Sequence, residues 1–303
     1  MLGKGAVRKC GLFYGGVMSD PAIAVLPYGG RLGRKLANRS LDDLTWPLGR
    51  PGRLAQGTVG DLTRKDHLIV FPKTAMHYQP HFGTRARVSM MLVEPPGIHG
   101  RHLKWLRWTH PRFFRIFTYN DALLRVIPNG IFLPYGTTWV PDWETLDTTK
   151  TANCSLIASA KRDQPGHALR HEIVEKIQAE GLDVTMLGRG YAPFDAKSDG
   201  LAHYRFSVVI ENAREPHYFT EKLVDSVLCE TVPIYWGCPN IADHIDTGGM
   251  ILCDGSSAIM DAVRGITSRQ YDALLPALQR AKPQAARFAN LEKRAAIALK
   301  DSL

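Results

Sequence analysis

The sequence predicts an α/β protein of two domains, each built on a parallel sheet. The chain has 303 residues, enough for two domains of about 150 residues each. Short apolar runs rich in β-branched residues alternate with longer amphipathic stretches, which is the pattern of β-α-β units. Residues 141–151 are polar and lack an apolar period, as a linker would. We therefore expect domains at residues 1–145 and 146–303.

The composition is that of an ordinary globular protein without a membrane span. Hydrophobic residues make up 45% and charged residues 22% of the chain, which is ordinary for a soluble protein. No apolar run approaches the ~20 residues needed to cross a bilayer, and no apolar segment follows the basic start of the chain, so no signal peptide is predicted. The 5 cysteines are scattered, without CxxC spacing. Buried free thiols in a reducing cytoplasm are expected, rather than a disulfide framework or a zinc site.

The formal net charge of +9 favours anionic partners. Three partners are compatible with it: a nucleotide-sugar pyrophosphate, the anionic inner face of a membrane, or a nucleic acid. A solvated basic surface explains the same charge, so the charge alone does not choose among these alternatives.

Glu94 is the candidate catalytic residue of the first domain. Strands are expected at residues 8–17, 67–71, 88–93, 115–118 and 131–134. Glu94 follows the third of these runs, and Pro95-Pro96 ends the strand, so its carboxylate projects from the carboxyl edge of the sheet. A general base suits such a place, within reach of the group that it deprotonates. The alternative is a surface carboxylate, or one paired with Arg101 or Arg112.

Two further segments of the first domain combine basic residues with glycine or aromatic residues. Residues 25–39 hold Gly29-Gly30 and Gly33 among several cations, but their spacing matches no phosphate-binding loop, so a plain loop is favoured. Residues 99–115, HGRHLKWLRWTHPRFFR, fit a nucleic-acid surface, a sugar-stacking surface or an amphipathic helix. We favour the helix, with one face lining the acceptor site.

The second domain continues the alternation of strands and helices. Strands are expected at residues 153–159, 184–187, 206–210, 234–236 and 250–253. Helices are expected at about residues 166–179, from residue 220, at 240–245 and 256–265, and at 268–303 with a break at Pro283. The amphipathic end of the chain is expected to pack back on the first domain. The other interpretation of this end is contact with an anionic membrane.

The central stretch of the domain gathers polar residues at one sheet edge. The strand 206–210 ends in Glu211-Asn212, and Tyr218 and Thr220-Glu221-Lys222 lead into the next helix. In parallel sheets, ligands bind outside the carboxyl ends of the strands. A capped helix with a surface Glu-Lys pair would explain Thr220 and Glu221, but not the gathering of polar side chains.

This stretch closely resembles the donor-binding signature of the family 10 α-1,3-fucosyltransferases. The matching blocks are Glu211-Asn212, residues 218–222 (YFTEK) and residues 232–237 (VPIYWG), in the family's order and spacing. Residues 134–139 (PYGTTW) resemble a segment that bacterial and viral members carry before the domain junction. The resemblance covers most of the second half of the chain and the first half only loosely.

The resemblance implies a GT-B arrangement, in which two Rossmann-like domains face each other across a cleft. It implies that the second domain binds GDP-fucose and the first domain the acceptor glycan, with inversion in a single displacement and Glu94 as base. Arg170, in PGHALRHEI, matches an arginine in the first turn of a helix that contacts the donor pyrophosphate. A guanidinium at a helix N-terminus suits that role.

The remaining polar residues of the signature receive donor-binding roles. Lys222 would neutralise the pyrophosphate charge that grows as the sugar leaves. Glu221 suits the ribose hydroxyls, Asn212 and Tyr218 suit the phosphates or the sugar, and Glu211 would face the sugar ring. No Asp-x-Asp motif is present where a metal would be needed, so no essential divalent ion or other cofactor is expected.

Two other functions remain open at this point. One is a GT-B transferase that uses a different nucleotide sugar, because the signature residues recognise the pyrophosphate and ribose of the donor more than its hexose. The other is a non-catalytic protein that binds nucleic acid or glycan through residues 99–115. The preferred interpretation expects no nucleic-acid partner, and a cytoplasmic enzyme that could sit at the inner membrane face.

Overall fold

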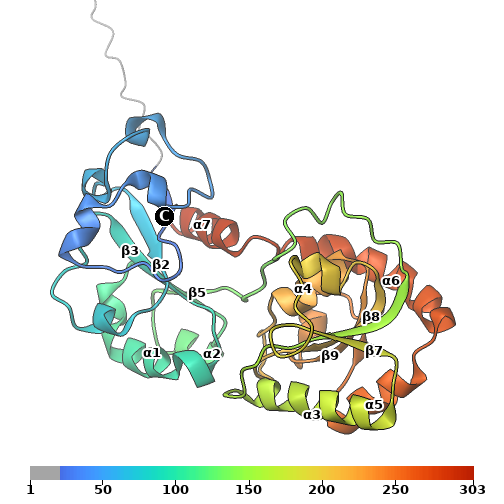
Figure 1. The fold of residues 1–303 in the computed structure, drawn as a ribbon. Coiled ribbons are helices and arrows are strands. Elements are labelled where there is room, and N and C mark those ends of the chain that lie inside the picture. Colours follow the sequence, from blue (N-terminus) through green and yellow to red (C-terminus); the bar gives the residue numbers. More distant parts are fainter. Residues whose placement is uncertain (1–20) are drawn as a thin grey trace, which may run out of the picture.

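The computed structural model describes residues 21–303, which form two α/β domains (Figure 1). The strand expected at residues 8–17, and Cys10 within it, lie outside the described residues. The first domain contains β1 (Ile23–Val25), β2 (His67–Val70), β3 (Arg87–Leu92), α1 (Pro96–Thr109), β4 (Ile116–Thr118), α2 (Asp121–Leu124) and β5 (Gly130–Phe132). Six short 3₁₀ helices join these elements: Arg34–Asn38, Leu41–Asp43, Gly52–Leu54, Val59–Asp61, Thr74–His77 and His110–Arg112.

The second domain begins after a connecting segment of residues 133–151. It contains β6 (Ala152–Ile157), α3 (Pro165–Glu180), β7 (Val184–Leu187), β8 (Tyr204–Ile210), α4 (Glu221–Leu228), β9 (Val232–Trp236), β10 (Ile251–Leu252), α5 (Ser256–Gly265) and α6 (Ser268–Ala286), with 3₁₀ turns at Lys197–Gly200 and Ile241–Asp243. The last helix, α7 (Leu291–Asp301), follows α6 after a short break.

The first sheet has the order β1-β2-β3-β4-β5, and all of its pairs are parallel. Strands β1, β2 and β4, and β3 apart from Arg87, are buried on both faces, which is why they appear in the sequence as continuous apolar runs. The edge strand β5 is partly exposed. Successive residues of β2 point to opposite sides, so that Leu68 and Val70 join one core and Ile69 joins the other. The strand β1 was not predicted, because the first strand was placed at residues 8–17 instead.

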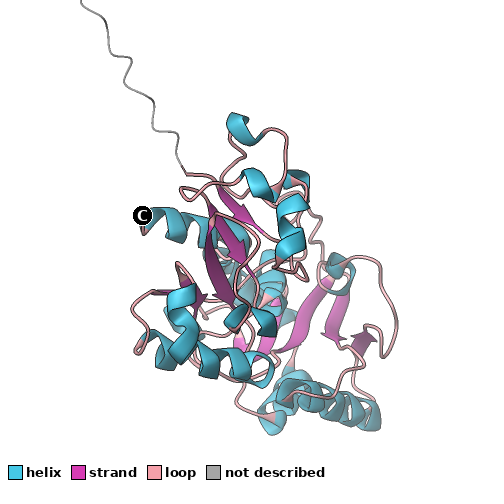
Figure 2. Cartoon of the chain, turned by 90° about the vertical axis from the view of Figure 1, so that its left-hand side faces the viewer, coloured by secondary structure: helices cyan, strands magenta, loops and turns pink. Residues whose placement is uncertain are grey.

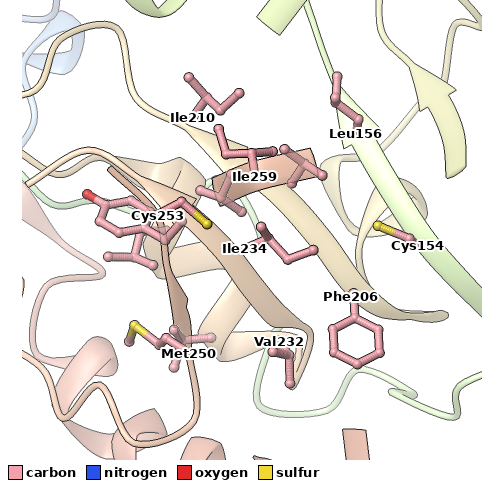
Figure 3. Packing of buried hydrophobic residues seen from close by; sticks show 14 of the residues in the cluster. Cys154, Leu156, Phe206, Ile210, Val232, Ile234, Met250, Cys253 and Ile259 are labelled. Carbon is pink, nitrogen blue, oxygen red and sulfur yellow. The ribbon is translucent and has the colours of Figure 1, made fainter. Parts of the chain in front are cut away.

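The second sheet has the order β10-β9-β8-β6-β7 and is also wholly parallel. Helices α3 and α5 cover one face, and α4 and α6 cover the other (Figure 1). Phe206 of β8, Val232 and Ile234 of β9 and Ile259 of α5 are among the side chains of this core (Figure 3). The chain moves from β6 outward to β7 and then returns to β8 on the other side of β6. The direction in which the chain adds strands therefore reverses between β6 and β8. Such a switch point, at the carboxyl ends of the strands, is where ligands bind in open α/β sheets.

The C-terminal helix crosses back to the first domain. Figures 1 and 2 show α7 beside the first sheet, with the C-terminus at that domain. Leu291, Ala295 and Leu299 are buried in the core formed with Ile23 and Ile69. The chain therefore joins the two domains twice, once after β5 and once after α6.

The break expected at Pro283 was wrong. Helix α6 continues through Pro276 and Pro283 and ends at Ala286. Pro283 is exposed, whereas Leu278, Ala281 and Ala285 are buried against the second core. Packing of this apolar face outweighs the cost of the interior proline.

The segment between the domains is fixed to the second domain by Asp225. Its Oδ1 accepts hydrogen bonds from the Thr138 hydroxyl at 2.6 Å and from the Trp139 amide at 3.0 Å. Burial raises the pKa of Asp225 to about 7, although the bond from Thr138 opposes the shift. The folded protein therefore keeps this proton to a higher pH than the unfolded chain, whose aspartates titrate near 3.8.

This shift predicts how stability depends on pH. Between pH 3.8 and about 7, the folded state binds more protons at this site than the unfolded state, so its contribution to stability falls as the pH rises and is constant above that range. Asp225→Asn removes the titration while keeping an acceptor oxygen. Chemical unfolding at pH 5 and pH 8 should show wild type losing stability relative to Asp225→Asn at the higher pH. An equal difference at the two pH values would contradict the shift.

The four described cysteines, Cys154, Cys229, Cys238 and Cys253, are buried free thiols, as expected. Within residues 21–303, no helix combines the length and apolarity needed to cross a membrane.

Candidate active site

The carboxyl ends of β6 and β8 bring α3 against Glu211-Asn212. The Gly166 amide, in the first turn of α3, donates to the Asn212 carbonyl at 3.0 Å. A Cβ at Gly166 would overlap the Glu211 carbonyl oxygen and lie 3.0 Å from the Asn212 Cα. Only glycine permits this approach, which places the N-terminus of a helix at the switch point of the sheet.

Arg170 lies at the same place, one turn further along α3 than predicted. Its Nε donates to the Ile210 carbonyl at 2.9 Å, and Nη2 donates to the Asn212 Oδ1 at 3.0 Å. Burial lowers its pKa, and the Glu211 carboxylate opposes the shift. These bonds hold the guanidinium rigidly beside the end of β8, and they pair two of the predicted donor-binding residues, Arg170 and Asn212.

Glu211 has a supporting position in the structure. The residue is fully buried, and its carboxylate accepts from the Thr220 amide at 2.8 Å and the Thr220 hydroxyl at 2.7 Å. Burial raises its pKa, although the ammonium of Lys222 opposes the shift. Thr220 in turn caps α4 by accepting from the Lys222 amide at 3.3 Å. The predicted contact between Glu211 and the sugar stays a prediction; in this conformation Glu211 fixes the turn that carries Lys222.

The ammonium group of Lys222 lies between two carboxylates. Its Nζ lies 3.0 Å from the Glu221 Oε1 and 3.7 Å from the Glu211 Oε2. Burial disfavours its charge, but the two carboxylates outweigh burial and raise its pKa. Glu221 is buried, yet Lys222 and Lys197 hold its pKa below the usual value. The ammonium is thus permanently charged, and 22% of the side chain is exposed.

Lys197 is a cation of this site that the sequence did not reveal. It lies in the 3₁₀ turn before β8 and lines a small cavity together with Ile210 and Lys222. Burial lowers its pKa, and the carboxylates of Glu221 and Asp225 oppose the shift. No ion pair or hydrogen bond engages its side chain within residues 21–303. No motif marks a lone lysine in a loop, so only the folded arrangement could identify it.

Tyr218 is buried beside this group and packs near Tyr119 and Tyr135, with ring centroids 5.6 and 6.4 Å away. Its hydroxyl is buried, and no described residue forms a hydrogen bond with it. Burial raises the pKa of this hydroxyl. Buried hydroxyls are almost always bonded, so this one points to a water or a ligand group. The predicted contact of Tyr218 with the donor stays untested.

Glu94 faces this group from the first domain. It lies after β3 and lines a cavity of about 520 Å³. Burial raises its pKa, and the charge of Lys222 opposes the shift. No ion pair engages Glu94 among the described residues, and Arg112 instead donates to backbone carbonyls, such as that of Met76 at 3.1 Å. A carboxylate with a raised pKa, beside a cavity and within electrostatic reach of Lys222, has the properties of a general base.

The cavity beside Glu94 (the acceptor cavity below) is bounded by the first domain, the segment between the domains and the start of α7. Its lining is mostly aromatic and polar: Tyr28, Phe71, Val93, Glu94, Tyr135, Thr137, Trp139, Asn290, Leu291 and Glu292.

Helix α1 lines no part of this cavity, contrary to the expectation for residues 99–115. The helix itself was predicted correctly, but His99, His102 and Leu106 are buried within the first domain. The first turn of α1 approaches the second domain, where a Cβ at Gly97 would meet the Gln164 side chain. No group of three or more metal-ligating side chains is found in residues 21–303.

A comparison with known families agrees with this geometry. Residues 148–254 match the family model described as "Glycosyltransferase family 10 (fucosyltransferase) C-term". The matched range includes Arg170, Lys197, Asn212 and Lys222. Over this range the chain is similar to the family 10 fucosyltransferases. This domain therefore carries the cation group, while Glu94 comes from the domain outside the match.

Curated relatives extend the similarity. The chain is 41% identical over 46 residues to the "Alpha-(1,3)-fucosyltransferase FucT" of Helicobacter pylori, covering 15% of this chain and 10% of the relative. It is 24% identical over 244 residues to the human "4-galactosyl-N-acetylglucosaminide 3-alpha-L-fucosyltransferase FUT5", covering 73% of this chain and 64% of the relative. The chain thus spans less than two thirds of the length of these relatives.

The solved structure of a glycosyltransferase from Rickettsia africae is similar in fold to both domains of this chain. The TM-score is 0.53 at 12% identity, with 78% of this chain and 76% of the other covered. The predicted GT-B arrangement of two Rossmann-like domains is confirmed by this likeness and by the two parallel sheets.

Proposed function

We propose that the protein is an inverting glycosyltransferase that moves fucose from GDP-fucose to a hydroxyl of an acceptor glycan. The observation that carries the proposal is the family 10 match over residues 148–254, because the site cations lie within that range. Arg170, Lys197 and Lys222 converge at the switch point between β6 and β8. A diphosphate is the ligand that suits such a group of cations.

The donor would lie with its diphosphate between the start of α3 and the start of α4. Helix N-termini offer free amides and partial positive charge to phosphate oxygens. Glu221, buried beside Lys222, suits the ribose hydroxyls as a hydrogen-bond acceptor. Tyr218 and Asn212 would contact the phosphates or the sugar.

The reaction is a single displacement at the anomeric carbon. The acceptor oxygen forms a bond to C1 of fucose while the bond from C1 to the β-phosphate oxygen breaks, and the electron pair leaves with GDP. Glu94 takes the proton of the acceptor hydroxyl. Lys222, Lys197 and Arg170 stabilise the negative charge that grows on the diphosphate. A divalent ion is not needed for this electrostatic work, so activity should survive chelation.

Two measurements test the proposal. Thermal unfolding with GDP-fucose, GDP-mannose, UDP-galactose and UDP-N-acetylglucosamine should show the largest stabilisation by GDP-fucose, about 2.7 kcal/mol at 100 times its Kd. Incubation with radiolabelled GDP-fucose and N-acetyllactosamine-type acceptors should then give labelled oligosaccharide. Stabilisation by a uridine sugar alone would contradict the donor assignment.

A further inference from the structure

The loop after β1 displays an aromatic ring at the edge of the acceptor cavity. The Gly30 amide donates to the Pro27 carbonyl at 2.9 Å, and Gly29 has a φ of 92°. These features define a turn whose third position requires glycine. Tyr28 occupies its second position, and 69% of the residue is exposed. The turn therefore holds the ring out from the domain.

Tyr28 lines two cavities at once. One is the acceptor cavity beside Glu94, and the other has a volume of about 480 Å³ and is formed by the loop itself. We call the second the basic cavity, because its charged lining residues are Arg31, Lys35 and Arg39. The charged side chains of the acceptor cavity are the carboxylates of Glu94 and Glu292. The Tyr28 ring therefore separates a cavity lined by positive charges from one lined by negative charges.

Two of the three cations that line the basic cavity, Arg31 and Lys35, are available to a ligand. Arg39 lies 3.3 Å from the Asp43 carboxylate. Arg31 and Lys35 are exposed, and neither makes an ion pair or hydrogen bond with any residue of 21–303. A fourth cation, Lys73, has its Nζ 5.4 Å from the centre of the Tyr28 ring.

The loop that carries these cations is anchored at its far end. The Gly33 amide donates to the Phe82 carbonyl at 2.9 Å. A Cβ at Gly83, where φ is 80°, would overlap the Gly33 carbonyl. The loop is therefore packed against a second segment, and its cations start from a fixed backbone.

We propose that the acceptor is an acidic glycan, an inference that rests on the proposed function. A sugar ring of the acceptor stacks on Tyr28 and Trp139 and places its hydroxyl at Glu94. A sulfate, phosphate or carboxylate on the same glycan lies in the basic cavity, where Arg31 and Lys35 bind it. Guanidinium groups bind such oxyanions through paired hydrogen bonds, and aromatic rings with exposed faces are suited to carry the apolar side of a sugar.

The test measures binding without transfer, so that it does not depend on the donor. Calorimetry in the presence of GDP compares neutral N-acetyllactosamine with its 3′-sulfated and 6-sulfated forms, each of which adds one negative group. We expect at least one sulfated form to bind about tenfold more tightly than the neutral form. The double variant Arg31→Ala/Lys35→Ala should lose this preference and keep its affinity for the neutral sugar.

A matched double variant controls for the loss of charge. Lys104→Ala/Arg107→Ala removes two exposed cations from α1 in the same domain, away from both cavities, and should keep the preference. Tyr28→Ala should weaken binding of the neutral and sulfated sugars alike.

Three outcomes would overturn the inference. The first is equal affinity of wild type for the neutral and both sulfated sugars. The second is an equal loss of preference in both double variants, which would indicate a general charge effect. The third is binding to vesicles that contain phosphatidylglycerol, lost in Arg31→Ala/Lys35→Ala, without any preference among the oligosaccharides; it would assign the cations to a lipid headgroup. Absence of transfer from GDP-fucose with a preserved preference for sulfate would instead refute only the proposed function.

Discussion

Replacing Lys222 by alanine is expected to lower kcat for transfer by about 10²- to 10³-fold, the usual effect of removing one group that stabilises developing charge. Lys222 is held 3.0 Å from both the Thr220 hydroxyl and the Glu221 carboxylate. Its ammonium therefore needs no reorganisation when the diphosphate leaves. Steady-state rates at saturating GDP-fucose measure the effect.

The alanine variant also leaves Glu221 and Glu211 without their counter-charge, so stability must be separated from catalysis. Lys222→Gln keeps a hydrogen-bond donor for Thr220 and Glu221 but removes the charge, and it should lose kcat as well. Lys176→Ala serves as the control, because Lys176 is an exposed cation on α3 paired with Glu172 at 2.7 Å. Normal turnover by a folded Lys222→Gln variant would rule out the charge as the stabilising element.

Glu94→Gln is expected to lower kcat by about 10²- to 10⁴-fold, the range for loss of a general base. The amide keeps the size of the side chain but cannot take the proton of the acceptor hydroxyl. Glu94 is active in its deprotonated form, and burial raises its pKa above the ordinary 4.5. The activity of wild type should therefore rise with pH through a value above 4.5.

The pH profile distinguishes a base from a residue that only shapes the cavity. In Glu94→Gln the residual activity should lack the acid limb that wild type shows. Glu144→Gln changes an exposed carboxylate of the segment between the domains and should leave both the rate and the profile unchanged. A Glu94→Gln variant with the wild-type acid limb would show that another group takes the proton.

Local sequence patterns were sufficient to predict most of the fold. The buried parallel strands appear as apolar runs bounded by turns, so that β2, β3 and β8 were placed within a few residues. The break predicted in α6 at Pro283 was wrong, because burial of the apolar face of the helix outweighs the cost of the interior proline. The first strand was placed at residues 8–17, so the 3-residue strand β1 beside the glycine-rich loop was overlooked.

The candidate site was predictable where order along the chain coincides with proximity in space. Glu211, Asn212 and Lys222 lie at the ends of adjacent elements, so their gathering follows from the β-α-β unit. The buried position of Glu211 was not predictable, because it depends on how the loop of residues 213–219 folds back to bring Thr220 to it. Lys197 and Tyr28 join the site from loops without a motif, and only tertiary structure brings them there.

The central claim is that Arg170, Lys197 and Lys222 hold a diphosphate. Calorimetry with GDP and GMP tests it most directly, because the two nucleotides differ only in the terminal phosphate. Wild type should bind GDP at least about tenfold more tightly than GMP, which is about 1.4 kcal/mol, and Lys197→Ala and Lys222→Gln should each reduce that difference. Equal binding of GDP and GMP by wild type, or an undiminished difference in both variants, would contradict the account.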